Sequence, residues 1–139
     1  MKQFTLLLSA LLLLVAAFSQ PNVTIYQIQG QADESPYLGQ VVATGGIVTG
    51  VFPAGFFLQD GEGEWNGVYV YTNETVEVGD EITLTAEVDE YYELTELKNV
   101  GNLQIISSGN ALPAPFVTGT WDVNDESLEG VLVQIQSAV

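Results

Sequence analysis

Two tyrosines at alternate positions are the first feature of this sequence that could recognise a ligand. Tyr69 and Tyr71 alternate with Val68 and Val70 in a short apolar segment. Because successive side chains of a β-strand point to opposite faces, both tyrosines are expected on one face and both valines on the other. Exposed rings on such a face can stack on sugars or on the bases of a single-stranded nucleic acid.

The neighbouring segments extend this face. In segment 56–60 the alternation places Phe56 and Leu58 in the core. It places Phe57 and Gln59 on the outer face. Segment 81–92 alternates in the same way, with threonines on its polar side. The sequence therefore predicts one ligand-binding face, made of Phe57, Gln59, Tyr69, Tyr71, Thr83 and Thr85. The alternative is that the tyrosines pack beneath a lead-in segment or a partner domain.

The glycine-rich loop 60–67 carries carboxylates at alternate positions, Asp60, Glu62 and Glu64. Oxygen ligands in a flexible loop are what Ca²⁺ favours, and Mg²⁺ also takes carboxylates, so this loop is a candidate divalent-cation site. It does not match an EF-hand, because Trp65 stands where that motif needs glycine and Tyr71 where it needs a bidentate glutamate. A solvated hairpin loop is the alternative.

A second group of acids follows the long alternating segment. Paired carboxylates can carry out acid–base chemistry on glycosides, but they need a cleft and one raised pKa, which a sequence does not reveal. We therefore assign no catalytic role to these residues, which are Glu87, Asp89, Glu90, Glu93 and Glu96.

The composition excludes several classes of function. The 139 residues include 18 Asp and Glu, two Lys and no His or Cys, for a formal charge of −16. Without His, Cys or Arg there is no Ser-His-Asp or Cys-His catalysis and no usual zinc site, so we expect a protein that is not an enzyme. The acidic surface offers no basic groove and repels anionic membranes, and a nucleic acid could bind only through divalent cations or other domains.

The N-terminus has the features of a secretory signal peptide. Lys2 precedes an apolar run from Leu6 to Ala17, and Ala17 with Ser19 fits the small-x-small rule for cleavage before Gln20. The run is shorter than the ~20 residues of a membrane span, and an uncleaved anchor is the alternative. We therefore expect a secreted protein whose mature chain begins at Gln20 and, having lost Lys2, is one unit more negative.

The rest of the chain is expected to be all-β. Val, Ile, Thr and aromatic residues predict strands over 41–52, 56–60, 68–71, 81–92, 103–106 and 131–135, with a turn or short helix over 94–99. The Gly45–Gly46 pair inside the first long strand indicates a bulge or sharp bend. Short strands after one strand bent by glycine suit a small closed barrel, which leaves no exposed sheet edge.

We expect one domain in four parts: the signal peptide 1–19, a lead-in segment 20–36, the barrel 37–116 and a final strand within 117–139. The final segment repeats an earlier pattern, since Leu128–Val133 is similar to Leu38–Ala43. It is either an ordinary sixth strand or the beginning of a second unit that this chain does not contain.

Several segments, in order along the chain, form a pattern found in one known family. They include Ser35–Val41, Gly46–Thr49, Gly55–Asp60, Gly67–Thr72, Leu112–Pro115 and Leu128–Val133. Together they resemble the OB-fold-like accessory domain that precedes the catalytic domain, of the endonuclease/exonuclease/phosphatase type, in secreted bacterial endonucleases and exonucleases. The resemblance spans about residues 26–133 and implies an all-β, five- to six-stranded OB-fold-like barrel.

In that family the catalytic His, Asn, Asp and Glu belong to the following domain, which this sequence does not include. The resemblance therefore implies a non-catalytic module that partners a downstream catalytic domain, or helps it hold single-stranded nucleic acid through Ca²⁺ or Mg²⁺. The residues themselves leave two alternatives open: an extracellular carbohydrate- or protein-binding module, and a structural spacer.

Overall fold

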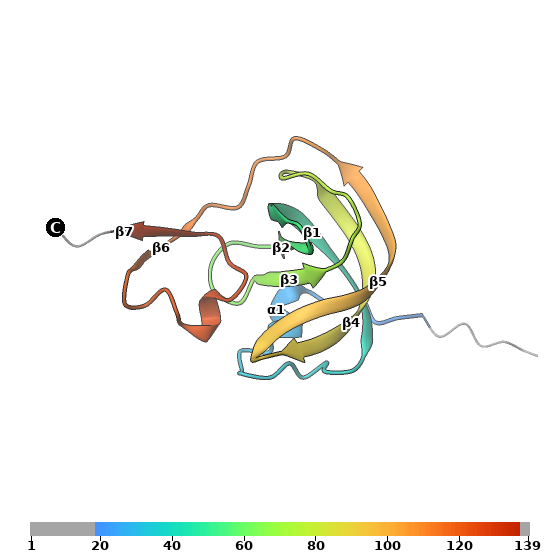
Figure 1. Cartoon of the computed structure of the whole chain (residues 1–139), viewed down its shortest axis with the longest axis horizontal. Helices are drawn as coiled ribbons and strands as arrows, with labels where there is room; N and C mark the ends of the chain where they lie inside the picture. Colours follow the sequence, from blue (N-terminus) through green and yellow to red (C-terminus); the bar gives the residue numbers. More distant parts are fainter. Residues whose placement is uncertain (1–18, 137–139) are drawn as a thin grey trace, which may run out of the picture.

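The computed structural model describes residues 19–136, so the predicted signal peptide lies, apart from Ser19, outside the described residues. Strands close into a barrel in the order β1-β2-β3-β5-β4, in which β3 and β5 run parallel and the other neighbours antiparallel (Figure 1). This confirms the predicted small all-β, OB-fold-like barrel. The strands are β1 (Val41–Phe52), β2 (Gly55–Gln59), β3 (Gly67–Tyr71), β4 (Glu81–Tyr91) and β5 (Leu94–Ser107).

The glycine pair bends β1 where the sequence predicted a bend. The first half of β1, Val41–Ile47, pairs with β4, and the second half, Ile47–Phe52, pairs with β2. A Cβ on Gly45 would lie 2.4 Å from the carbonyl oxygen of Ile82, and one on Gly46 2.4 Å from that of Gln59. Only glycine allows both neighbouring backbones to approach this closely. The bulge itself comes later, between Val48 and Gly50.

The barrel core follows the predicted alternation. Phe56 and Leu58 of β2 and Val68 and Val70 of β3 are fully buried, as their positions in the sequence predicted. The lead-in segment adds α1 (Ile25–Gln29), a single turn of helix that the sequence did not reveal. Thr24 begins it with a capping box to Gln27. Two isoleucines of α1, at positions 25 and 28, are fully buried in the same core.

The predicted turn or helix over 94–99 is wrong, because β5 already begins at Leu94. Tyr91 pairs with Leu94, so Tyr92 and Glu93 alone make the turn between β4 and β5. Both have positive φ, 50° and 69°, as the two central residues of a type I′ hairpin turn require. Asn-Gly or Asp-Gly usually marks such a turn, so Tyr-Glu gave no indication of it.

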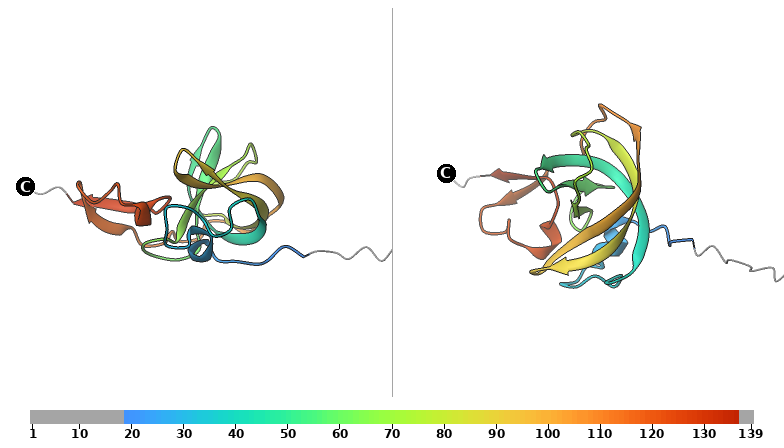
Figure 2. Two further views of the ribbon diagram at one scale, coloured as in Figure 1. Left: turned by 90° about the horizontal axis from the view of Figure 1, so that it is seen from below. Right: turned by 45° about the vertical axis from the view of Figure 1, so that its right-hand side comes forward.

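A second small sheet stands beside the barrel. It pairs β6 (Phe116–Gly119) in parallel with β7 (Val133–Gln136) (Figures 1 and 2). The chain that connects the two strands contains the 3₁₀ turn η1 (Glu126–Leu128). The predicted last strand, 131–135, is therefore not a sixth strand of the barrel, and β6 was not predicted. We call residues 116–136 the C-terminal lobe.

Replacing Gly46 tests the bend. We expect Gly46→Ala to lower the free energy of unfolding by about 1–3 kcal/mol, because the added Cβ overlaps the backbone of β2. Urea denaturation followed by circular dichroism measures this change. Gly119→Ala is the matched control, since its nearest neighbour would be a side-chain oxygen of Asp122 at 3.4 Å. Equal stability of the two variants would contradict the role of Gly46.

Candidate functional site

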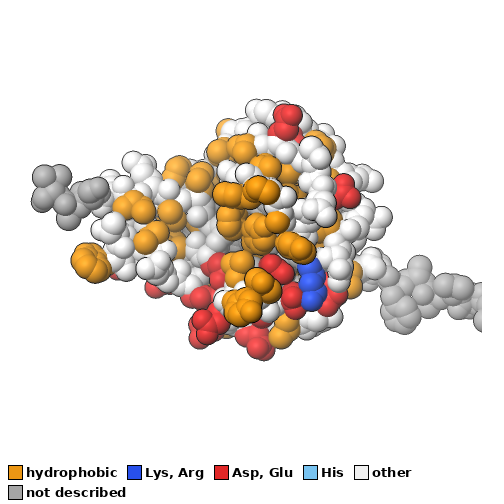
Figure 3. All heavy atoms as spheres, in the orientation of Figure 1, with side chains coloured by type: hydrophobic (Ala, Val, Ile, Leu, Met, Phe, Trp, Pro, Cys, Tyr) orange, Lys and Arg blue, Asp and Glu red, His pale blue; other side chains and the backbone are white. Residues whose placement is uncertain are grey.

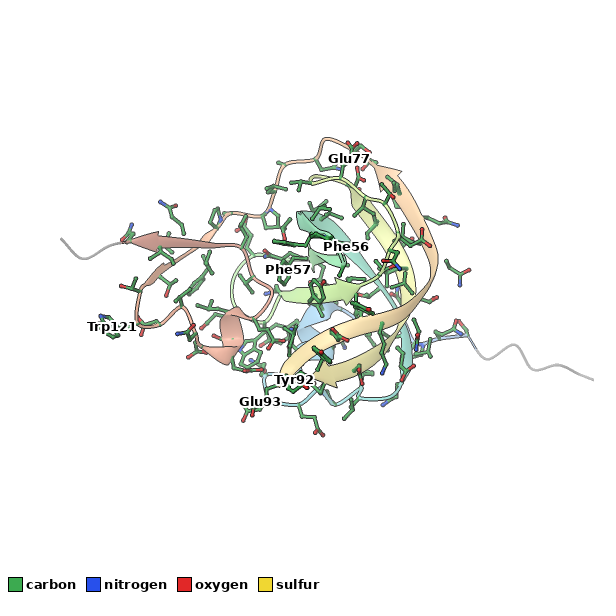
Figure 4. The ribbon with its side chains drawn as sticks, in the orientation of Figure 1. Phe56, Phe57, Glu77, Tyr92, Glu93 and Trp121 are labelled. Atoms are coloured by element: carbon green, nitrogen blue, oxygen red, sulfur yellow. The ribbon has the colours of Figure 1, made fainter. Side chains whose placement is uncertain are left out.

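Four aromatic rings lie together on the outer surface of β1, β2 and β3. Phe57 and Tyr69 face each other across the β2–β3 pair, with ring centroids 5.2 Å apart. Phe52, at the end of β1, meets Phe57 edge to face at 5.6 Å. Figure 4 labels Phe57 beside Phe56, the neighbouring residue that is buried in the core. We call Phe52, Phe57, Tyr69 and Tyr71 the aromatic face.

The aromatic face is open to solvent at two of its rings. Phe52 is 53% exposed and Tyr71 is 56% exposed, whereas Phe57 and Tyr69 are half-buried. Gly55 pairs with both Phe52 and Tyr71, and a Cβ there would lie 2.8 Å from the Tyr69 hydroxyl oxygen. The Tyr69 ring can therefore lie across β2 only because residue 55 has no side chain.

A groove runs between the aromatic face and the C-terminal lobe. Its volume is about 300 Å³. On the barrel side it is lined by Thr49, Gly50, Phe52 and Phe57, and on the lobe side by residues 130–133. The lobe therefore forms one wall of the candidate site.

Acidic groups border the rings. Tyr69 pairs with Glu96 across the parallel β3–β5 contact, and Glu96 is only 6% exposed. Burial and the nearby Asp89 raise the pKa of Glu96, while burial and Glu96 raise the pKa of Tyr69. Lys98 lies on the same strand, but its ammonium group is 2.8 Å from a carboxylate oxygen of Asp89. In the view of Figure 3, hydrophobic side chains gather over β2 and β3 with acidic side chains below them.

The prediction that Gln59 is exposed to a ligand is wrong. Gln59 is fully buried, its amide nitrogen donates to the carbonyl oxygen of Gly61 at 3.1 Å, and its amide oxygen accepts from the backbone N–H of Leu132 at 2.6 Å. The C-terminal lobe covers the end of β2 and buries an outward position of the strand. Gln59 therefore joins the lobe to the barrel and is not available to a ligand.

The two threonines lie apart from the rings. Thr83 and Thr85 belong to β4, whose barrel neighbours are β1 and β5, and not β2 or β3. The Thr85 hydroxyl donates to the carbonyl oxygen of Gly101 at 3.0 Å. Of the six predicted face residues, the structure brings together Phe57, Tyr69 and Tyr71.

Each of the three predicted cation ligands accepts a hydrogen bond from a different distant segment of the chain. Asp60 accepts from the backbone N–H of Ile25 at 2.8 Å, and Glu62 accepts from that of Ala114 at 3.2 Å. Glu64 accepts from the hydroxyl of Ser127 at 2.9 Å. Within residues 19–136, no group of three or more potential ligand side chains is placed to hold a metal ion.

Phe52 was not among the predicted face residues. The register of β1 against β2 shifts between Val48 and Gly50, so side chains after this bulge point to the face opposite to the one that simple alternation predicts.

Tyr92 was also not predicted to have a role. It is 87% exposed at the tip of the β4–β5 hairpin (Figure 4).

Comparison with protein-family models, curated proteins and solved structures finds no match to this chain. In the described residues, 19–136, no helix is long and apolar enough to cross a membrane. The aromatic face and the residues around it are therefore the features of the molecule that point to a function.

The role of Gln59 can be tested by substitution. We expect Gln59→Ala to lower the free energy of unfolding by about 1–3 kcal/mol, because the Leu132 N–H and the Gly61 carbonyl lose their partner inside the protein. Gln104→Ala on β5 is the control, since Gln104 is exposed. Urea unfolding measures the stability of both variants. If the Gln59 variant is as stable as the control, Gln59 does not hold the lobe on the barrel.

Proposed function

We propose that this chain is a non-catalytic binding module of a secreted protein and that the aromatic face is its ligand-binding surface. The observation that carries the proposal is the row of contacting rings, Phe52, Phe57 and Tyr69, that stays partly open to solvent on one side of the barrel. The lack of His, Cys and Arg in the sequence supports a role in binding without catalysis.

Uncharged sugars are the ligand class that this surface favours. A sugar ring can stack its C–H groups on the aromatic side chains, and the hydroxyl of the exposed Tyr71 can exchange hydrogen bonds with sugar hydroxyl groups. A phosphate backbone needs positive charge beside the stacking rings. Lys98 is the sole basic side chain in residues 19–136, and it is held by Asp89 and Glu87.

Single-stranded nucleic acid is the second candidate, favoured by the resemblance to the accessory domains of secreted nucleases. Two segments that carry it, Gly55–Asp60 and Gly67–Thr72, contribute Phe57, Tyr69 and Tyr71 to the aromatic face. Bases could stack there if divalent cations bridged the phosphates to the surrounding acids. Binding of this kind would require Ca²⁺ or Mg²⁺, whereas binding of an uncharged sugar would not.

Binding measurements test the proposal. We expect a glycan array to identify a neutral oligosaccharide, and calorimetry with that sugar to give saturable binding in the presence of EDTA. Phe57→Ala and Tyr71→Ala should each weaken the affinity by about tenfold, because each removes a stacking ring worth about 1–3 kcal/mol.

Thr83→Ala and Thr85→Ala are matched controls on β4, away from the rings, and should bind like the unmodified protein. Fluorescence anisotropy with labelled single-stranded DNA, with and without Ca²⁺ or Mg²⁺, separates the two ligand classes. Cation-dependent DNA binding that needs Phe57 and Tyr71 would replace the sugar by nucleic acid. Absence of binding to both ligands, or equal binding by all four variants, would overturn the proposal for this face.

A further inference from the structure

Glutamates from two parts of the chain converge where the C-terminal lobe meets the β4–β5 hairpin. Thr95 at the start of β5 lies between them: its backbone N–H donates to Glu129 at 2.8 Å and its hydroxyl donates to Glu90 at 2.8 Å. Glu90 also accepts from the backbone N–H of Ser35 at 2.9 Å. Glu126 of η1 lies near Glu129, and its charge raises the pKa of the Glu129 carboxyl.

These carboxyls lack the partners that ionised groups need. Within residues 19–136, one oxygen of Glu90 and one of Glu126 are buried without a hydrogen-bond partner. In the same part of the chain the charged groups that face the cluster are all acids, because Asp33 and Glu93 join the three glutamates. The sole lysine of residues 19–136 is engaged on β4 with Asp89 and Glu87. Glu90, Glu126 and Glu129 are partly buried, so ionisation of the whole cluster would bring like charges together where water screens them only in part.

We propose that this cluster is a proton-operated latch: the C-terminal lobe is held on the barrel while the glutamate cluster keeps a proton, and is released when the cluster ionises. The part that moves is the C-terminal lobe. Two further hydrogen bonds hold it on the barrel: the Trp65 N–H donates to the Ser127 carbonyl oxygen at 2.7 Å, and the Leu132 N–H donates to the Gln59 side chain. Release of the lobe removes residues 130–133 from the wall of the groove beside Phe57.

The direction of the pH dependence follows from Glu129. Burial, and then the charge of Glu126, raise the pKa of Glu129 from its ordinary 4.5 to about 7, and burial raises that of Glu126. A carboxyl whose pKa is raised in the closed state binds its proton more tightly there than in the open state. The closed state is therefore most favoured in acid, and it loses stability as the pH rises from 4.5 through about 7.

The tryptophans give a direct readout. Trp65 is half-buried and bonded to the lobe, whereas Trp121 is 93% exposed, so Trp121→Phe removes background emission without touching the latch. In this variant, with EDTA present, we expect Trp65 emission to shift to longer wavelength as the pH rises from 4.5 through about 7. Far-UV circular dichroism should keep the barrel signal throughout the titration.

Adding Glu129→Gln should abolish the shift. The amide oxygen can still accept from Thr95, but the side chain carries no charge at any pH. Glu74→Gln removes the same charge from an exposed position outside the cluster and should leave the transition in place. Hydrogen exchange gives a second measurement, in which protection factors for the Thr95, Trp65 and Leu132 amides should fall by up to about tenfold per pH unit between 4.5 and about 7. The Val88 amide, bonded to Gln40 within the barrel, should stay protected.

Three results would overturn the latch. The first is no transition in Trp65 emission between about pH 5 and about pH 9, the range that spans the expected proton release. The second is the same transition in the Glu129→Gln and Glu74→Gln variants. The third is simultaneous loss of the barrel signal, which would make the event global unfolding. None of these readouts needs a ligand, so the latch stands or fails independently of the proposed sugar binding.

Discussion

Closure of the barrel depends on one strand pairing with two neighbours that lie in different directions. β1 meets β4 along its first half and β2 along its second half, and the partner changes at Ile47, directly after Gly45 and Gly46, where both neighbouring backbones approach closely. Without that bend β2 and β3 would not lie beside β1, and the rings of Phe52, Phe57 and Tyr69 would not form one surface. The candidate site is therefore a consequence of the same two glycines that close the sheet.

The strands that were predicted correctly are those whose side chains alternate between a core and a solvent face. β1 and β4 agree with the sequence almost residue for residue, because Ile82, Leu84 and Ala86 are buried and the residues between them are not. The start of β5 was missed because contacts within the fold override local preferences there. Tyr92 and Glu93 adopt a left-handed turn that Gly or Asn normally forms.

The candidate site was predictable only in part, for a related reason. Alternation identifies which side of a strand faces outward, so it identified Phe57, Tyr69 and Tyr71. It does not reveal which outward positions a distant segment covers, so Gln59 was misplaced. It also does not reveal which strands are neighbours around a barrel, so Thr83 and Thr85 were grouped with rings that lie on other strands.

A chain with eighteen acids and so few cations must place its carboxylates against other donors. Asp60 bonds the backbone of Ile25, Glu62 that of Ala114 and Glu129 that of Thr95, so acids join segments that salt bridges join in most proteins. Bonds of this kind cost least where water also reaches the carboxyl group, as at the exposed Glu62.

The same arrangement is unfavourable where several partly buried acids meet, as at Glu90, Glu126 and Glu129. Two other joints between lobe and barrel, at Gln59 and at the tight contact of Gly67 with Gly130, carry no ionisable side chain. A further joint, from Glu64 to the Ser127 hydroxyl, has one carboxyl, which is exposed. Within residues 19–136, sensitivity to pH is therefore expected where several carboxyls face one another.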